Sequence, residues 1–124
     1  MNIQRFNHEQ LGEALGPYSQ AVVHNSTLYT SGLTAFGSTA QNESISEQTR
    51  LIFLQLSIIC QAFNVTLENL IKVTLFVSDM SDIVALRSTL FEVYGKYLPA
   101  SSLIKVDALF SEDLKIEIEA IIAL

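Results

Sequence analysis

The sequence is short of cysteine, histidine and clustered positive charge. Its single cysteine, Cys60, excludes a disulfide within the chain and points to a reducing compartment. One cysteine and two histidines, His8 and His24, are too few for a protein-only structural zinc site, so we expect no metal. The 7 Lys and Arg residues form no basic run, and 13 Asp and Glu residues bring the formal charge to −6. Neutralising phosphates takes clustered Lys and Arg, so we expect no nucleic-acid partner.

Neither a targeting signal nor a membrane span is indicated. The first eight residues hold no apolar segment of signal-peptide length. The most apolar stretch, residues 51–63, is interrupted by Gln55, Ser57 and Gln61 and is shorter than the ~20 residues that cross a bilayer. We therefore expect a cytoplasmic protein with no membrane partner.

Charged residues make up only 16% of the chain, against 49% hydrophobic residues. The length of 124 residues suits one core, since single cores typically span ~100–150 residues, and we expect residues 1–124 to form one domain. A charged fraction well below the usual ~25% leaves few groups to solvate the surface of so small a body. We expect other copies of the chain to cover part of that surface.

The hydrophobic pattern predicts an α+β fold. The predicted elements are strands at 19–23 and 28–32, a helix between Ser44 and Asn64, a strand at 70–77, a helix at 83–97, and strands at 102–109 and 114–122. Helices segregated from strands in this order indicate one mostly antiparallel sheet with two helices on one face. The other face is then uncovered, which favours a ring of subunits packed sheet to sheet. The alternative is a monomer with one solvated sheet face.

The first helix is predicted to be deeply buried. Ser44 and Glu47 form a capping box before it, and Asn64 stands where a left-handed C-cap residue would sit. Cys60 falls inside the helix, where we expect it to pack rather than react. Two apolar strips run along the helix: Ile52, Leu56, Ile59 and Phe63 in the first, and Leu51, Ile58 and Ala62 in the second.

The sequence contains five short motifs whose order and spacing, taken together, are specific to one family. They are Gly16-Pro17-Tyr18-Ser19-Gln20, Thr30-Ser31-Gly32, Thr74-Leu75-Phe76-Val77-x-Asp79, Pro99-Ala100-x-Ser102 and Lys115-Ile116-Glu117-Ile118-Glu119-Ala120. In this order the set resembles the RidA/YjgF family, the reactive-intermediate deaminases, over residues 15–122.

The resemblance implies a chorismate-mutase-like α+β fold that forms a homotrimer with ligand clefts between subunits. It also implies a reaction that needs no cofactor: hydrolysis of 2-imino or enamine acids, such as 2-iminobutanoate and 2-iminopropanoate, to 2-keto acids and ammonia. By the same resemblance, Tyr18, Ser31 with the backbone of Gly32, and Glu117 are the site residues. A carboxylate such as Glu117 can orient or deprotonate the attacking water.

The sequence departs from the family pattern where the substrate carboxylate is bound. Ser101 stands in place of an arginine, Leu103 in place of a frequent cysteine, and Leu33 in place of a usual glutamine. A planar guanidinium binds a carboxylate through two parallel hydrogen bonds, and a serine supplies neither the charge nor the fork. Removing one partner of a buried, charge-assisted pair costs about 2–5 kcal/mol of binding.

Arg87 is the candidate replacement for that arginine. The family usually has asparagine at this position, and the helical neighbours of Arg87 are the apolar Ile83, Val84, Leu90 and Phe91. We hypothesise that Arg87 enters the cleft from the second helix. The alternative is an arginine that snorkels or forms an ion pair at an interface. Lys105, Glu119 and Arg50 rank lower as site residues.

Two functions therefore follow from the sequence. The first is a trimeric imine deaminase with an altered substrate range. The second is a non-catalytic trimer that binds a small keto acid or related metabolite for regulation or buffering, the activity having been lost with the arginine that Ser101 replaces. RNA cleavage, a claim attached to relatives, fits poorly with a chain of charge −6.

Overall fold

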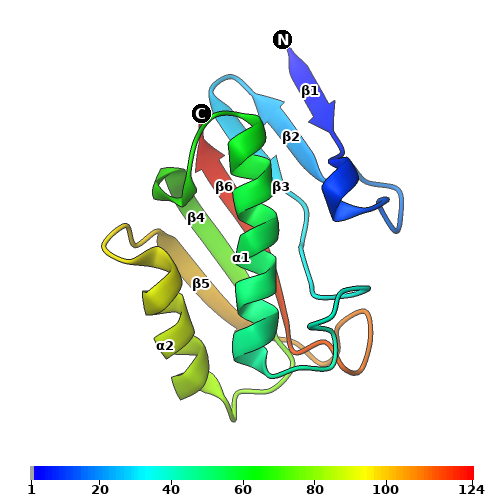
Figure 1. The fold of residues 1–124 in the computed structure, drawn as a ribbon, viewed down its shortest axis with the longest axis vertical. Coiled ribbons are helices and arrows are strands. Elements are labelled where there is room, and N and C mark those ends of the chain that lie inside the picture. The colour runs from blue at the N-terminus through cyan, green and yellow to red at the C-terminus, as the bar shows by residue number, and fades with distance from the viewer. Residues whose placement is uncertain (1) are drawn as a thin grey trace.

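A computed structural model describes residues 2–124 as one six-stranded sheet with two α-helices on the same face (Figure 1). The elements are β1 (Ile3–Phe6), η1 (Glu9–Leu11), β2 (Ala21–His24), β3 (Thr27–Thr30), α1 (Ile45–Ala62), η2 (Leu67–Asn69), β4 (Leu70–Val77), α2 (Ile83–Tyr94), β5 (Ala100–Lys105) and β6 (Ile116–Ala123), where η marks a short 3₁₀ helix. The predicted α+β architecture is confirmed.

The strands lie in the order β1-β2-β3-β6-β4-β5. All neighbours are antiparallel except β4 and β5, which are parallel. Parallel neighbours need a crossover, and α2 supplies it before β5 joins the sheet edge. The final strand, β6, then enters between β3 and β4, so the last two strands of the chain are not adjacent to each other.

The bounds of β2, β3 and β6 differ from the sequence prediction by one or two residues, and three other elements differ more. The edge strand β1 was not predicted; it is short, largely exposed and paired only with β2, so it carries no burial pattern. Helix α2 ends at Tyr94 because Gly95 adopts a left-handed φ of 61°, ending the helix before Pro99 is reached. Strand β5 occupies 100–105 rather than 102–109.

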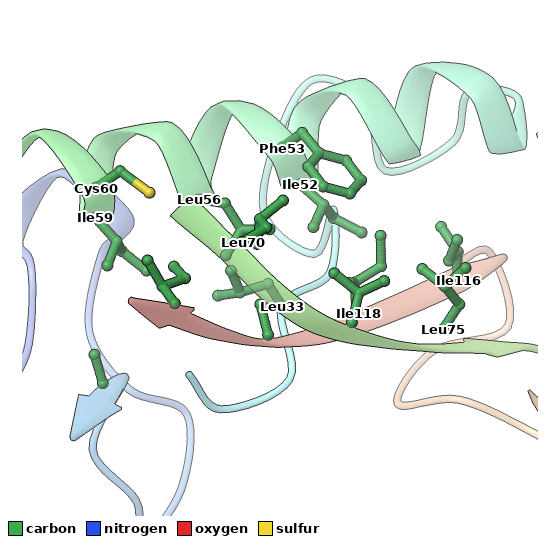
Figure 2. Close-up of a cluster of buried hydrophobic side chains, with 14 of the residues drawn as sticks. Leu33, Ile52, Phe53, Leu56, Ile59, Cys60, Leu70, Leu75, Ile116 and Ile118 are labelled. Carbon is green, nitrogen blue, oxygen red and sulfur yellow. The ribbon is translucent and has the colours of Figure 1, made fainter. Parts of the chain in front are cut away.

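Helix α1 packs across β4 and β6 and forms one side of the core. Ser44 caps it, its Oγ accepting a hydrogen bond from the Glu47 N–H at 3.2 Å, and Asn64 has the expected left-handed φ of 59°. Figure 2 shows the facing side chains between helix and strands: Leu33, Ile52, Phe53, Leu56, Ile59, Cys60, Leu70, Leu75, Ile116 and Ile118, all of them buried. Burial raises the pKa of the Cys60 thiol to about 11, as suits a packing residue.

The second apolar strip of α1 is less buried than predicted. Leu51 and Ile58 are half-buried and Ala62 is exposed, while Leu54 is 58% exposed. The sheet reaches only one side of the helix, so burial of the second strip by neighbouring copies of the chain stays a prediction.

One buried amide joins α1 to two loops. The Nε2 of Gln48, which is fully buried, donates to the carbonyl oxygens of Gln41 and Asp113, each at 2.9 Å. Its Oε1 accepts a hydrogen bond from the Lys115 N–H at 2.8 Å. A single side chain therefore fixes the loop before α1 and the loop before β6, both of which border the candidate site described below.

The helices leave the second face of the sheet uncovered. This open face comprises Tyr29, Lys72, Thr74, Phe76, Ile104, Glu117, Glu119 and Ile121. Tyr29 and Ile104 are more than 40% exposed there. Within residues 2–124, no helix is long and apolar enough to cross a membrane.

Gln48→Leu is predicted to lower the free energy of unfolding by about 2–4 kcal/mol. It leaves a buried N–H and buried carbonyl groups without hydrogen-bond partners, and each such group costs about 1–3 kcal/mol. Urea unfolding at a fixed protein concentration measures this change. Gln61→Leu, at an exposed position of the same helix, is the matched control. Equal stability of the two variants would contradict the role given to Gln48.

Candidate functional site

The candidate site begins where β3 separates from β6. Leu33 rejoins β6 by pairing with Ile118 through two backbone hydrogen bonds. Between the regular ladder and that pair, the Oγ1 of Thr30 accepts the N–H of Ala120 at 2.9 Å, in place of a carbonyl oxygen. The chain thus bulges at Ser31 and Gly32, and such bulges redirect side chains and backbone near functional sites.

Gly32 lies directly against the carboxylate of Glu117. A Cβ at position 32 would overlap the Oε2 and Cδ atoms of Glu117, so a larger residue would displace the carboxylate from this position. The Gly32 N–H makes no hydrogen bond to another group of residues 2–124. The contact places an open backbone donor beside the Glu117 carboxylate.

The hydroxyl of Ser31 has a fixed direction. Its Oγ donates to the carbonyl oxygen of Ser19 at 2.6 Å, while the Ser31 N–H donates to the carbonyl oxygen of Gln20 at 3.0 Å. A carbonyl oxygen cannot donate, so the hydroxyl hydrogen is committed to Ser19. Toward a ligand, the Ser31 Oγ is therefore an acceptor.

Tyr18 stands in the loop that Ser31 anchors. Its hydroxyl oxygen accepts the N–H of Leu15 at 3.3 Å, and its ring is 44% exposed. The neighbouring Gln20 is buried and secures the base of the loop, accepting the His8 N–H at 2.7 Å and donating to the Gly12 carbonyl oxygen at 2.8 Å. The Tyr18 hydroxyl retains its hydrogen for donation to a ligand.

Tyr18, Ser31, Gly32 and Glu117 line one open cavity of about 350 Å³, called here the Glu117 cavity. Its remaining walls are Leu15, Gly16, Pro17, Thr34 and Phe110. The structure thus brings together the four residues that the resemblance implied for the site, from the loop before β2, the segment after β3, and β6.

Two causes raise the pKa of Glu117. The larger is burial, which disfavours the ionised carboxylate, and the second is the negative charge of Glu119 on the same sheet face. Within residues 2–124, no Lys or Arg lies in ion-pair distance of Glu117. An unpaired carboxylate with a raised pKa, beside a cavity, has the properties of a general base.

Arg87 and Ser101 line a second cavity of about 320 Å³, called here the Arg87 cavity. The other walls are largely apolar: Leu90, Phe91, Tyr94, Leu98 and Pro99. The Arg87 side chain is exposed, and within residues 2–124 it has no carboxylate at ion-pair distance. Arg50, by contrast, joins Glu47 at 2.6 Å and Glu92 at 3.0 Å across the two helices.

The two cavities lie on different sides of the sheet. Ser101 is in register with the buried Val73, on the face that carries the helices, whereas Glu117 belongs to the open face. Leu103 lines neither cavity and packs against the core, and Lys105 is exposed near the end of β5. One chain therefore does not bring its candidate anion-binding residues to Glu117.

Phe110 is a wall of the Glu117 cavity that the sequence reasoning treated only as part of a connection. The available signal was an aromatic residue inside the polar segment Phe110-Ser111-Glu112-Asp113.

Among residues 2–124, no three His, Cys, Asp or Glu side chains gather as metal ligands would.

Comparison with known proteins defines the class. The family model described as Endoribonuclease L-PSP matches residues 9–124, and the chain belongs to this family, the RidA/YjgF family. The 2-iminobutanoate/2-iminopropanoate deaminase of Salmonella typhimurium is 33% identical over 118 residues, 91% of each chain. A RutC family protein of Pyrococcus horikoshii is 32% identical over 117 residues, also 91% of each. RidA from an Antarctic Psychrobacter has the same fold, with a TM-score of 0.87 at 28% identity over 98% of this chain and 99% of that one.

Glu119→Gln is predicted to lower the pKa of Glu117, because it removes the like charge that contributes to raising it. Carbon-13 NMR titration of the glutamate carboxyls measures the change directly. Glu92→Gln, on α2, is the control and leaves the titration of Glu117 unchanged. A Glu117 titration that is identical in wild type and Glu119→Gln would contradict this account of its electrostatics.

Proposed function

We propose that the protein hydrolyses 2-imino or enamine acids to 2-keto acids and ammonia without a cofactor. The observation that carries this proposal is the unpaired Glu117 carboxylate, held against Gly32 in a cavity shared with Ser31 and Tyr18. Membership of a family that includes a protein named as an imine deaminase supports it.

The residues suit each step of imine hydrolysis. The substrate is attacked as the protonated imine: Glu117 takes a proton from water as the water oxygen attacks C2, and the product of this step is a neutral carbinolamine. The Ser31 Oγ, whose own hydrogen is committed to Ser19, accepts a hydrogen bond from that nitrogen. The Tyr18 hydroxyl is a donor at the same cavity. Glu117 then returns its proton to the nitrogen, the C2–N bond breaks and ammonia leaves; the hydroxyl at C2 gives its proton to Glu117, so that C2 becomes the ketone of the product.

The proposed site is completed between copies of the chain in a homotrimer. The Glu117 cavity and the Arg87 cavity each hold only some of the residues that an imino acid needs, and the open face exposes Tyr29, Ile104 and other apolar groups. Packing of open faces covers those groups, and the proposed trimer also brings the Arg87 cavity, which lies at the edge strand β5, against the Glu117 cavity of another copy.

In that assembly Arg87 binds the substrate carboxylate. Its guanidinium is free of carboxylates within the described chain and lies in the same cavity as Ser101, the position where the resemblance places an arginine. Leu103 is then a packing residue beneath the strand rather than a ligand contact.

A second candidate function is binding of a small keto acid without turnover. Ser101 favours this function, because a neutral side chain at that position binds the substrate carboxylate more weakly than an arginine does, and that carboxylate aligns the substrate for reaction. RNA is a poor candidate substrate for a chain of charge −6. We propose the cytoplasm as the location of the protein, because its reducing conditions suit a single, buried cysteine, Cys60.

Imine hydrolysis is tested with 2-iminopropanoate generated in situ by an amino-acid oxidase, with semicarbazide trapping the imine that remains. The wild-type protein is expected to accelerate loss of the imine, and Glu117→Gln to lower kcat/KM by about 100-fold or more. Glu92→Gln is the matched control for loss of an exposed carboxylate. Absence of acceleration at micromolar protein would leave the binding function, which a pyruvate titration then tests.

Arg87→Ala is predicted to weaken pyruvate binding about tenfold, the effect of losing one charge-assisted contact. Adding Ser101→Arg to Arg87→Ala is expected to restore binding, because it returns a guanidinium to the same cavity. Lys96→Ala removes an exposed cation elsewhere near the end of α2 and is the control. Unchanged affinity in Arg87→Ala would show that Arg87 does not bind the carboxylate.

A further inference from the structure

Phe110 has an unusual position for a large aromatic side chain. It stands in a polar loop, is 67% exposed, and yet forms a wall of the Glu117 cavity. Its ring meets that of Phe36 edge to face, with centroids 4.8 Å apart and planes at 85°. Phe36 comes from the loop before α1, so two segments far apart in the sequence meet at this pair.

Hydrogen bonds hold both aromatic residues in place. The Gln41 side chain joins the two loops: its Oε1 accepts the Gly37 N–H at 2.7 Å, and its Nε2 donates to the Asp113 carboxylate at 3.1 Å. The Ser111 hydroxyl donates to the same carboxylate at 2.6 Å. An exposed aromatic pair supported in this way is a fixed feature of the cavity rather than a loose loop tip.

The walls of the Glu117 cavity differ in polarity. Ser31, Gly32 and Glu117 supply the polar part, where the proposed chemistry takes place. Leu15 and Phe110 supply apolar surface, and each is at least 60% exposed. A ligand that fits both parts has a polar reacting end and an apolar side chain.

We propose that Phe110, supported by Phe36, is a specificity-determining residue that selects imino and keto acids with bulky apolar side chains. The inference rests on the proposed function only in placing the reacting end of the ligand at Glu117. Covering the exposed Phe110 ring with an apolar side chain removes both surfaces from water, at about 25 cal/mol per Å². A short or charged side chain gains none of this free energy.

The test compares the affinities of phenylpyruvate, pyruvate and 2-oxoglutarate, measured by calorimetry at one pH. Wild type is expected to bind phenylpyruvate most tightly. Phe110→Ala is expected to reduce the preference for phenylpyruvate over pyruvate about tenfold, in line with the discrimination that apolar pockets achieve. Phe110→Leu is expected to retain part of the preference, and Phe36→Ala to lose less than Phe110→Ala.

Leu54→Ala is the matched control, because Leu54 is an apolar side chain of α1 that is 58% exposed and lines neither cavity. It is expected to leave all three affinities unchanged. The preference is measured by binding, so it is independent of turnover. A Phe110-dependent preference in a protein that hydrolyses no imine supports this inference while refuting the deaminase function. Equal loss of affinity for all three ligands in Phe110→Ala, or no binding of any of them, would overturn it.

Discussion

The close approach of the Glu117 carboxylate to the backbone of Gly32 is the constraint on which the site depends. In its observed position the carboxylate needs the space left by the missing Cβ of Gly32, a hydroxyl at Thr30 to satisfy the displaced ladder donor, and a loop that Ser31 can anchor. Each requirement is local, but each depends on β6 lying beside β3, which the insertion of the last strand into the sheet brings about. The topology and the chemistry of the site are thus linked through one strand pair.

The rigidity of the site comes from polar side chains in otherwise irregular segments. Gln48 reaches from α1 to the loops on both sides of the Glu117 cavity, and Gln41 ties those loops to each other. Loops carry functional groups well only when a fixed framework positions them. Here the framework is the core between α1 and the central strands (Figure 2), and buried amides transmit its order to the cavity walls.

Much of the fold was predictable because its central elements have strong burial patterns. Strand β4 alternates buried and open positions, and α1 has a capping serine and one fully buried face. The edge strand β1 was not predictable in this way, because an exposed strand shows no such alternation. Local periodicity also does not show where a strand lies in the sheet. The pattern of β6 indicated a strand, but not its position between β3 and β4.

The site was predictable only as far as its residues fall in motifs. Tyr18, Ser31, Gly32 and Glu117 do, and the structure brings them to one cavity. Phe110 does not, because an aromatic residue in a polar loop acquires its significance only when Phe36 and the cavity are seen beside it. Arg87 could be noticed from its apolar helical neighbours, but its sharing of a cavity with Ser101 depends on the crossover from α2 to β5.

The charges of the two cavities complement an imino acid better than its product. Burial and the charge of Glu119 raise the pKa of Glu117 in the folded chain, so its ionisation costs free energy. Between the pKa values of Glu117 in the unfolded and folded chain, the stability of the fold therefore falls as pH rises. In the proposed site, a protonated imine beside Glu117 offsets that cost, while its carboxylate pairs with Arg87 from another copy of the chain. In the proposed reaction, hydrolysis converts the positive end into ammonia and a proton, and leaves a keto acid that pairs only with Arg87. The electrostatic strain that prepares Glu117 to accept a proton therefore also favours departure of the product.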